Sequence, residues 1–113
     1  MNIQIFGKPK CFDTKKTERY FKERGIKFQA IDLSKYKISA GEFKSVRQSV
    51  GSLDKLIDEK NTSPNALLLK YLSSEEAKEE KLLEFPSLLK TPIVRNGRQA
   101  TVGFCPEIWK NWD

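Results

Sequence analysis

The sequence predicts an α/β protein in which a β-α-β unit is followed by a helical block and then by a β-β-α unit. Three observations support this order. Residues 2–6, NIQIF, alternate apolar and polar side chains and end at a glycine. Ser39 and Glu42 form a capping-box pattern at the start of a helical stretch. Asn96-Gly97 separates two short strand-like runs and is a strong hairpin signal.

The first unit reads as strand, helix and strand. Residues 12–25 predict the helix, with Asp13 or Thr14 able to cap its start and Gly25 to end it. Residues 26–33, IKFQAIDL, predict the second strand, and so short a crossover makes the two strands parallel. The side chains expected to face apolar surroundings are Thr17, Tyr20, Phe21, Ile26, Phe28, Ala30 and Ile31.

The middle of the chain has a helical pattern, with Phe43, Val46 and Val50 on one face of its first helix. Residues 52–60 are also predicted to be helical, because their apolar side chains stand at helical spacing. Further helical segments are expected at residues 63–72, 73–85 and 86–90.

The end of the chain returns to a period of two. Residues 91–104 predict a β-hairpin. Residues 105–113, CPEIWKNWD, predict a last helix, which should pack against the rest of the protein through the side chains of Ile108, Trp109 and Trp112. At 113 residues the chain has the length of one domain. We therefore expect a single domain over residues 1–113, with a helical insertion at about residues 38–90.

The net charge of +6 is concentrated in the first half of the chain. Residues 1–50 hold 12 Lys and Arg against 5 Asp and Glu, whereas residues 51–113 hold 9 against 10. A basic surface can attract nucleic acid, acidic proteins or small anions. The lysines are not interleaved with aromatic residues or glycines that look exposed, and no nucleic-acid-binding motif is visible. We expect a solvated basic face and no direct nucleic-acid binding.

The composition also excludes several classes of protein. No apolar run approaches the roughly 20 residues of a membrane span, and the N-terminus lacks a signal-peptide pattern, so we expect a cytoplasmic protein without membrane contact. The absence of histidine excludes Cys-His and Ser-His catalytic pairs and histidine metal sites. Two cysteines alone cannot form a structural zinc site, so we expect no metal and no bound cofactor.

Cys11 stands between the first strand and the first helix, in GKPKCFDTKK. The unpaired N–H groups and the positive dipole at a helix start favour a thiolate. Lys8, Lys10, Lys15 and Lys16 add positive charge nearby. The alternative is a buried structural cysteine, which so lysine-rich a loop disfavours. The pattern therefore predicts a reactive thiol.

Four stretches of the chain carry a resemblance to a known family: IQIFGKPKCFDTKK, the helical block, TPIVRNG and VGFCPEIW. In this order and with these gaps, the chain resembles the glutaredoxin-dependent arsenate reductases and their Spx-type relatives. The resemblance covers nearly the whole chain and implies a thioredoxin-like fold.

The resemblance also implies site residues. It makes Cys11 the nucleophile, puts a cis Thr91–Pro92 bond beside it, and makes Lys10, Thr91 and Pro92 substrate-binding residues. Thr14 stands where oxidation-sensing Spx-type regulators carry a second cysteine, so the site has one local thiol. Thr14 can instead hydrogen-bond the thiolate or cap the helix. Cys105 would fall close to Cys11, where it could resolve a mixed disulfide or simply be a half-buried cysteine.

The anion-binding arginines of these arsenate reductases are not matched. The three corresponding stretches read DEKN, TP and FCPE. Without bidentate guanidinium groups, arsenate should bind poorly, which speaks against arsenate reduction. The sequence therefore predicts a glutaredoxin-like monothiol oxidoreductase that acts on a disulfide, a glutathione adduct or a related small substrate, with either glutathione as a co-substrate or Cys105 completing the cycle. The alternative is an Spx-type transcriptional regulator that binds RNA polymerase.

Overall fold

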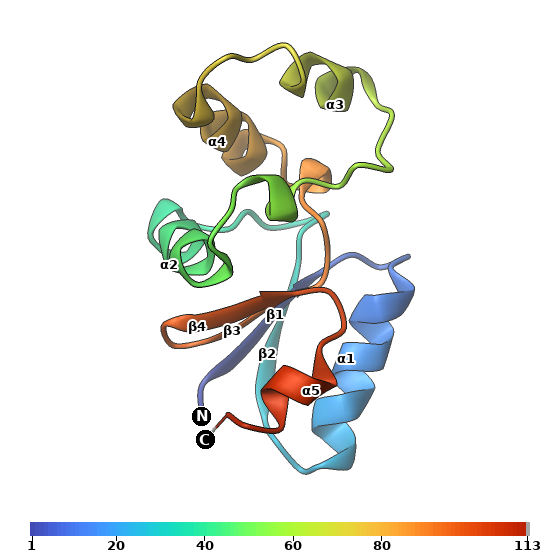
Figure 1. Ribbon diagram of the computed structural model, residues 1–113. Coiled ribbons are helices and arrows are strands. Elements are labelled where there is room, and N and C mark those ends of the chain that lie inside the picture. Colours follow the sequence, from blue (N-terminus) through green and yellow to red (C-terminus); the bar gives the residue numbers. More distant parts are fainter. Residues whose placement is uncertain (113) are drawn as a thin grey trace.

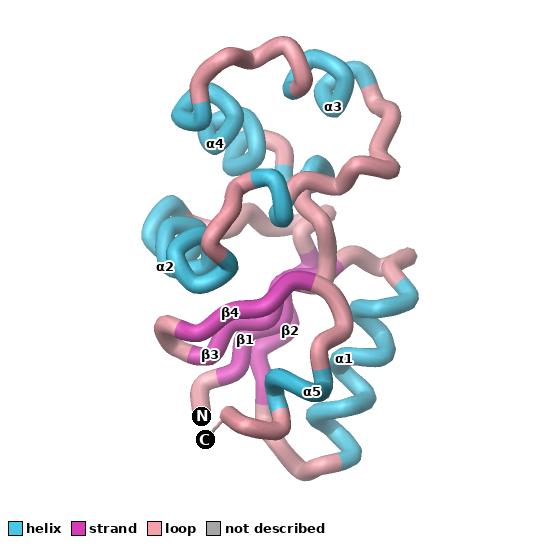
Figure 2. The backbone as a smooth tube through the Cα atoms, in the orientation of Figure 1, coloured by secondary structure: helices cyan, strands magenta, loops and turns pink. Residues whose placement is uncertain are grey.

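The computed structural model describes residues 1–112, which form a four-stranded sheet with helices on both faces (Figures 1 and 2). The strand order is β2-β1-β3-β4. β1 and β2 are parallel, whereas β3 is antiparallel to both β1 and β4. The strands are β1 (Ile3–Gly7), β2 (Phe28–Asp32), β3 (Ile93–Asn96) and β4 (Gln99–Val102). The α/β fold with β-α-β and β-β-α units is confirmed.

Each face of the sheet is covered by a different set of helices. α1 (Phe12–Glu23) and the short α5 (Pro106–Trp109) cover one face, and α2 (Ala40–Val50) covers the other (Figure 1). Because successive side chains of a strand point to opposite faces, β1 contributes side chains to the hydrophobic core on both faces of the sheet. Ile5 packs with α1 and α5, whereas Phe6 packs with α2.

The segment between β2 and β3 is helical and shares a core with the sheet. It contains α2, the 3-10 helix η1 (Asp54–Leu56), α3 (Pro64–Leu69), α4 (Glu75–Glu84) and the 3-10 helix η2 (Pro86–Leu88). The predicted capping box of Ser39 and Glu42 starts α2. Arg47 of α2 pairs with Glu75 and Glu79 of α4, so that these two helices are joined by charge as well as by packing.

Three local predictions are wrong. Residues 52–60 do not form a regular helix: only η1 is helical, and Ile57 is extended and bridges to Leu89. Ala30 is exposed, because β2 is an edge strand. Ile108 is 44% exposed, since a helix as short as α5 buries only one side, that of Trp109.

The predicted hairpin is confirmed. Asn96 pairs with Gln99 at the ends of the two strands, so the loop consists of Gly97 and Arg98. Gly97 has a φ of 61°, in the left-handed region that glycine adopts readily. Within residues 1–112, no helix combines the length and the apolar character that crossing a bilayer requires.

Candidate active site

Three segments that are distant in sequence meet around Cys11: the β1–α1 loop, the segment after η1, and the segment from η2 to β3. Lys8 joins them. Its Nζ atom donates to the carbonyl oxygens of Ser87 (2.9 Å) and Leu89 (2.7 Å) and lies 3.8 Å from Oδ2 of Asp58. Burial lowers the pKa of Lys8, although Asp58 and Cys11 oppose the shift. Lys8 therefore stabilises the arrangement of the three segments as well as adding charge beside the thiol.

Cys11 is the N-cap residue of α1 and is half-buried. Its backbone amide donates to the carbonyl of Lys8 (3.1 Å), and its Sγ atom donates to the carbonyl of Thr91 (3.6 Å). The Thr91–Pro92 peptide bond is cis, as the resemblance implied. The structure thus brings Cys11 to the residue that precedes Pro92. The predicted capping of α1 by Asp13 or Thr14 is wrong, because Cys11 holds the cap position and no side chain caps the helix.

The surroundings of Cys11 stabilise its thiolate. Partial burial raises the pKa of the thiol, but hydrogen bonds outweigh it. They come from the side chains of Thr14 and Thr91 and from the backbone amides of Thr14 and Asp13. The pKa of Cys11 is therefore below its ordinary value. Two of these donors are the amides of the first turn of α1, so the start of the helix contributes directly.

Thr14 is a buried residue whose hydroxyl oxygen has no hydrogen-bond partner within residues 1–112. A buried hydroxyl without a partner is costly, and a hydrogen bond from Thr14 contributes to the lowered pKa of Cys11, so we infer that this hydroxyl donates to Cys11 once the thiol is ionised. Thr14 is held there by close packing, because its methyl group lies where a Cβ atom on Gly7 would stand. The absence of a side chain at Gly7 thus lets Thr14 pack against the end of β1.

Replacing Thr14 with valine should raise the pKa of Cys11, because valine keeps the shape of threonine but cannot donate to the thiolate. The rate of alkylation of Cys11 at pH 7 should fall accordingly. Thr17→Val is the matched control: the Thr17 hydroxyl donates to the carbonyl of Asp13 (2.7 Å) on the same helix, and it is not among the donors to Cys11. Equal alkylation rates in wild type and Thr14→Val would contradict a role for the Thr14 hydroxyl.

A pocket of about 790 Å³ opens beside Cys11. We call it the Cys11 pocket. Its lining is dominated by charged side chains from all three segments. The lining residues are Lys8, Lys10, Cys11, Asp13, Asp54, Lys55, Ile57, Asp58, Glu59, Lys60, Lys90 and Thr91. Such a pocket is large enough for a small thiol or part of a peptide.

The lysines of the Cys11 pocket differ from those that the sequence suggested. Lys15 and Lys16 do not line it; Lys16 instead lies 4.0 Å from Asp13 and over the ring of Phe104. Lys10 and Thr91 line it, whereas Pro92, which follows Thr91 in the chain, is buried and does not line it; the substrate-binding role of these residues stays a prediction. Lys55, Lys60 and Lys90 also line the pocket but were missed. Lys60 lies in DEKN and Lys90 precedes Thr91, so a search for cations in general would have found both.

Cys105 is the N-cap residue of α5 and is half-buried. Its Sγ atom donates to the carbonyl of Val102 (3.3 Å), and burial together with Glu107 raises its pKa. It does not line the Cys11 pocket, and both cysteines are free thiols. The resolving role stays a prediction, and the raised pKa speaks against it, because it leaves less of the attacking thiolate. Within residues 1–112, no cluster of side chains suited to a metal ion is found.

Comparison with known proteins gives the family. The ArsC family matches residues 6–112, which include Cys11, Thr91 and Pro92. The chain belongs to the ArsC family. The match runs from the end of β1 through the helical segment between β2 and β3 to the residues after α5, so family membership rests on nearly the whole chain rather than on the cysteine alone.

Relatives of this ArsC family member include both regulators and reductases. It is 28% identical to the global transcriptional regulator Spx 2 of Oceanobacillus iheyensis, over 92% of this chain and 78% of the relative. Among solved structures, an arsenate reductase from Vibrio cholerae has a TM-score of 0.82 at 28% identity, covering 96% of this chain and 94% of that one. An ArsC family related protein from Bacteroides fragilis has a TM-score of 0.86 at 22% identity, over 100% and 98% of the two chains. These similarities establish an arsenate reductase-like, Spx-type protein with a thioredoxin-like fold.

Proposed function

We propose that this ArsC family protein is a monothiol oxidoreductase in which Cys11 attacks disulfides, with glutathione as the reducing co-substrate. The observation that carries the proposal is the thiol itself: Cys11 begins α1, its pKa is lowered, and it borders a pocket of about 790 Å³. A lowered pKa provides thiolate at neutral pH, and the thiolate is the nucleophile in disulfide exchange.

The reaction has two exchanges. The Cys11 thiolate attacks the glutathione sulfur of a mixed disulfide, a bond forms between the two sulfurs, and the substrate leaves as a thiolate that takes up a proton. The thiolate of a second glutathione then attacks the Cys11–glutathione disulfide, releasing oxidised glutathione and the Cys11 thiolate. In the net reaction the mixed disulfide and one free glutathione give the substrate thiol and oxidised glutathione, and the proton lost by the free glutathione balances the one that the substrate thiolate takes up, so atoms and electrons balance. Lys10 and Thr91 are the proposed substrate-binding residues.

Arsenate is not the proposed substrate. The pocket offers lysine ammonium groups, which act as point charges, rather than arginine guanidinium groups that bind an oxyanion in a bidentate manner. Arg95, the arginine nearest to Pro92 in sequence, donates to Gln4 (2.7 Å) and does not line the pocket. We expect arsenate to be reduced far more slowly than a glutathione mixed disulfide.

The test is turnover of a glutathione–cysteine mixed disulfide in the presence of glutathione, followed through oxidised glutathione. We expect turnover well above the protein-free reaction, and mass spectrometry should detect glutathione on Cys11 when the reducing glutathione is limiting. No turnover and no adduct would contradict the proposal.

A second candidate function is a regulator that binds RNA polymerase. The observation that favours it is the similarity to the regulator Spx 2 over 92% of this chain. This function needs a docking surface rather than a nucleophile. It predicts that purified RNA polymerase binds wild type and Cys11→Ser equally well, and absence of binding to the polymerase would remove this candidate.

A further inference from the structure

The hydrogen bonds around Lys8 form a closed ring that includes Cys11. The backbone amide of Cys11 donates to the carbonyl of Lys8 (3.1 Å), which fixes the cysteine relative to the lysine. The Lys8 ammonium donates to the carbonyl of Leu89 (2.7 Å). Two residues further along the chain, the carbonyl of Thr91 accepts from the Cys11 thiol (3.6 Å), which closes the ring. A displacement of Leu89 would therefore be passed on to Thr91.

Thr91 lies between two anchored positions. On its C-terminal side β3 starts at Ile93, which pairs with Phe6 of β1. On its N-terminal side is Leu89, which Lys8 holds. Both anchors are provided by the same stretch of chain, the end of β1 and the residue that follows it. The stretch that leads to the thiol thus sets the position of Thr91 from both sides.

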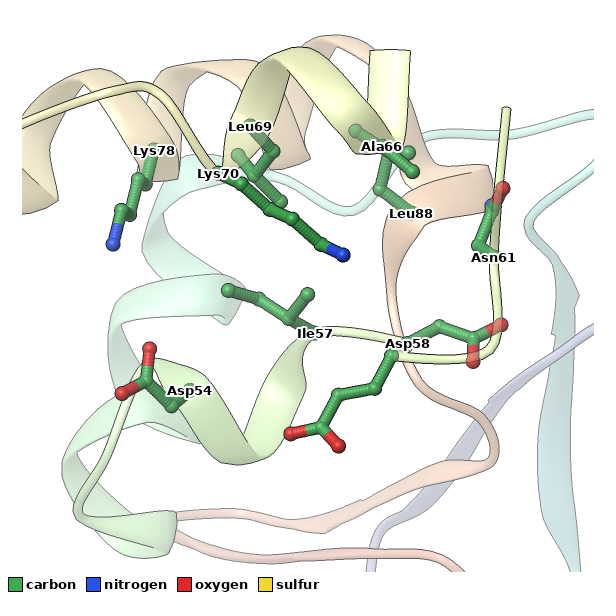
Figure 3. Close-up of a pocket in the computed structure, with 10 residues that line it drawn as sticks. Asp54, Ile57, Asp58, Asn61, Ala66, Leu69, Lys70, Lys78 and Leu88 are labelled. Atoms are coloured by element: carbon green, nitrogen blue, oxygen red, sulfur yellow. The ribbon is translucent and has the colours of Figure 1, made fainter. Parts of the chain in front are cut away.

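Lys8 attaches the helical segment between β2 and β3 to the β1–α1 loop. The two parts of that segment near Lys8 are joined to each other by backbone hydrogen bonds. The Asp58 amide donates to the carbonyl of Leu88 (2.9 Å), and the Lys90 amide donates to that of Leu56 (2.8 Å). Figure 3 shows Asp58 on the segment after η1 and Leu88 of η2 in this region. These bonds do not involve the β1–α1 loop, whereas the ammonium of Lys8 binds carbonyl oxygens of one part and faces Asp58 of the other.

Lys8 is held more firmly than the neighbouring Lys10. An ammonium group has three N–H donors. Two carbonyls, those of Ser87 and Leu89, accept from Lys8, and the carboxylate of Asp58 lies 3.8 Å away. The Lys8 side chain is only 22% exposed, and a charge so far removed from water needs such partners. Lys10 lines the same pocket but is exposed and forms no salt bridge within residues 1–112, so it adds charge without joining segments.

We propose that Lys8 is a positioning residue, which keeps Thr91 in contact with Cys11 by holding the residues before Thr91 against the β1–α1 loop. The side chain of Thr91 is one of the donors that lower the pKa of Cys11. Lys8 thus supports the thiolate through Thr91 and not by charge alone. This inference rests on the proposed function, in which Cys11 is the nucleophile, and adds a residue that acts on it through another. The charged groups that act on Lys8 itself are Asp58, from the segment after η1, and Cys11.

A double-mutant cycle between Lys8 and Thr91 tests the proposal. The rate at which iodoacetamide alkylates Cys11 is measured in the Cys105→Ser background, at a pH below all the midpoints, where the rate follows the thiolate fraction. Lys8→Met should lower this rate at least about threefold, because a hydrogen bond to an ionised group is weakened. In the Thr91→Val background the factor should be at least about twofold smaller, since the effects of residues that act through one another are not additive. Equal factors in the two backgrounds would overturn the proposal.

Lys10→Met is the matched control, because it removes one positive charge from the same pocket but no attachment between segments. Its factor should be the same with and without the Thr91 hydroxyl. A coupling as large as that of Lys8→Met would show that charge alone links these positions to Thr91, contrary to the proposal. Circular dichroism checks the fold of each variant. Lys8→Gln, which keeps a polar end in the half-buried site, takes the place of Lys8→Met in the cycle if that variant does not fold.

The pH profile separates positioning from general damage to the site. Because the loss of Lys8 should raise the pKa of Cys11, alkylation of Lys8→Met should recover to at least the wild-type plateau once the pH exceeds the raised midpoint. A rate that stays low at every pH would mean that the substitution damages the site in another way, and Lys8 would not be a positioning residue for the thiolate.

Failure of this inference and failure of the proposed function can be told apart. If the cycle shows coupling but the glutathione mixed disulfide is not turned over, Lys8 remains a positioning residue and the oxidoreductase proposal fails. If the disulfide is turned over but the two factors are equal, the oxidoreductase proposal remains and the positioning role of Lys8 fails.

Discussion

Cys11→Ser should reduce turnover of a glutathione mixed disulfide to the rate of the protein-free reaction. A serine hydroxyl is far weaker as a nucleophile toward sulfur than a thiolate, and the hydroxyls of Thr14 and Thr91 cannot replace it. Because Cys11 is only half-buried and serine is similar in size, the free energy of unfolding should change little. Turnover is measured as oxidised glutathione formed, and stability by urea denaturation.

Cys105→Ser is the matched control for this prediction. With a raised pKa and no place in the Cys11 pocket, Cys105 should be dispensable when glutathione is the reductant, and its replacement should leave turnover within about twofold. Loss of turnover in Cys105→Ser would favour the resolving role instead. Residual turnover in Cys11→Ser would contradict Cys11 as the nucleophile.

Trp109→Ala should lower the free energy of unfolding by about 3–5 kcal/mol, the range for removing a buried tryptophan. Trp109 is 3% exposed, and its ring centroid lies 5.2 Å from those of both Tyr20 and Phe21. Its Nε1 atom donates to the hydroxyl of Thr101 (2.8 Å), which alanine would leave without this donor. The four-residue α5 has little stability of its own, so it depends on this anchor to cover the sheet.

Urea denaturation measures this loss, with Ile108→Ala as the control on the same helix. Ile108 is 44% exposed, and replacing an exposed side chain changes stability by about 0.5 kcal/mol or less. Equal losses in the two variants would show that α5 is not held by Trp109.

Where the sequence carried a local signal, the fold could be predicted. The Ser39–Glu42 box and the Asn96-Gly97 pair both describe short-range geometry, and both are found in the structure. The prediction for residues 52–60 failed because apolar spacing alone cannot separate a helix from a turn followed by an extended segment. Ile57 is extended because it pairs with Leu89, a contact that no local pattern reveals.

The residues of the candidate site likewise fall into those that the sequence could predict and those that it could not. Cys11 could be found because it stands between a strand and a helix start, and Thr91 and Pro92 because of the family resemblance. Lys55 and Lys60 reach the Cys11 pocket only through the folding of η1 and the segment after it, so their sequence positions say nothing about Cys11. The role of Lys8 in joining three segments also depends on contacts made across some 80 residues, with Ser87 and Leu89.

The pKa of Cys11 is the measurement that tests the central claim most directly. It is obtained from the rate of alkylation by iodoacetamide between pH 4 and 10 in the Cys105→Ser background, where Cys11 is the only thiol. Because the folded-state pKa is lowered, the rate should stay on its plateau at pH values where an ordinary cysteine is protonated, and decline only as the pH falls through the lowered value. A midpoint at or above the ordinary cysteine value of about 8.5 would contradict the reactive thiolate on which the proposed function rests.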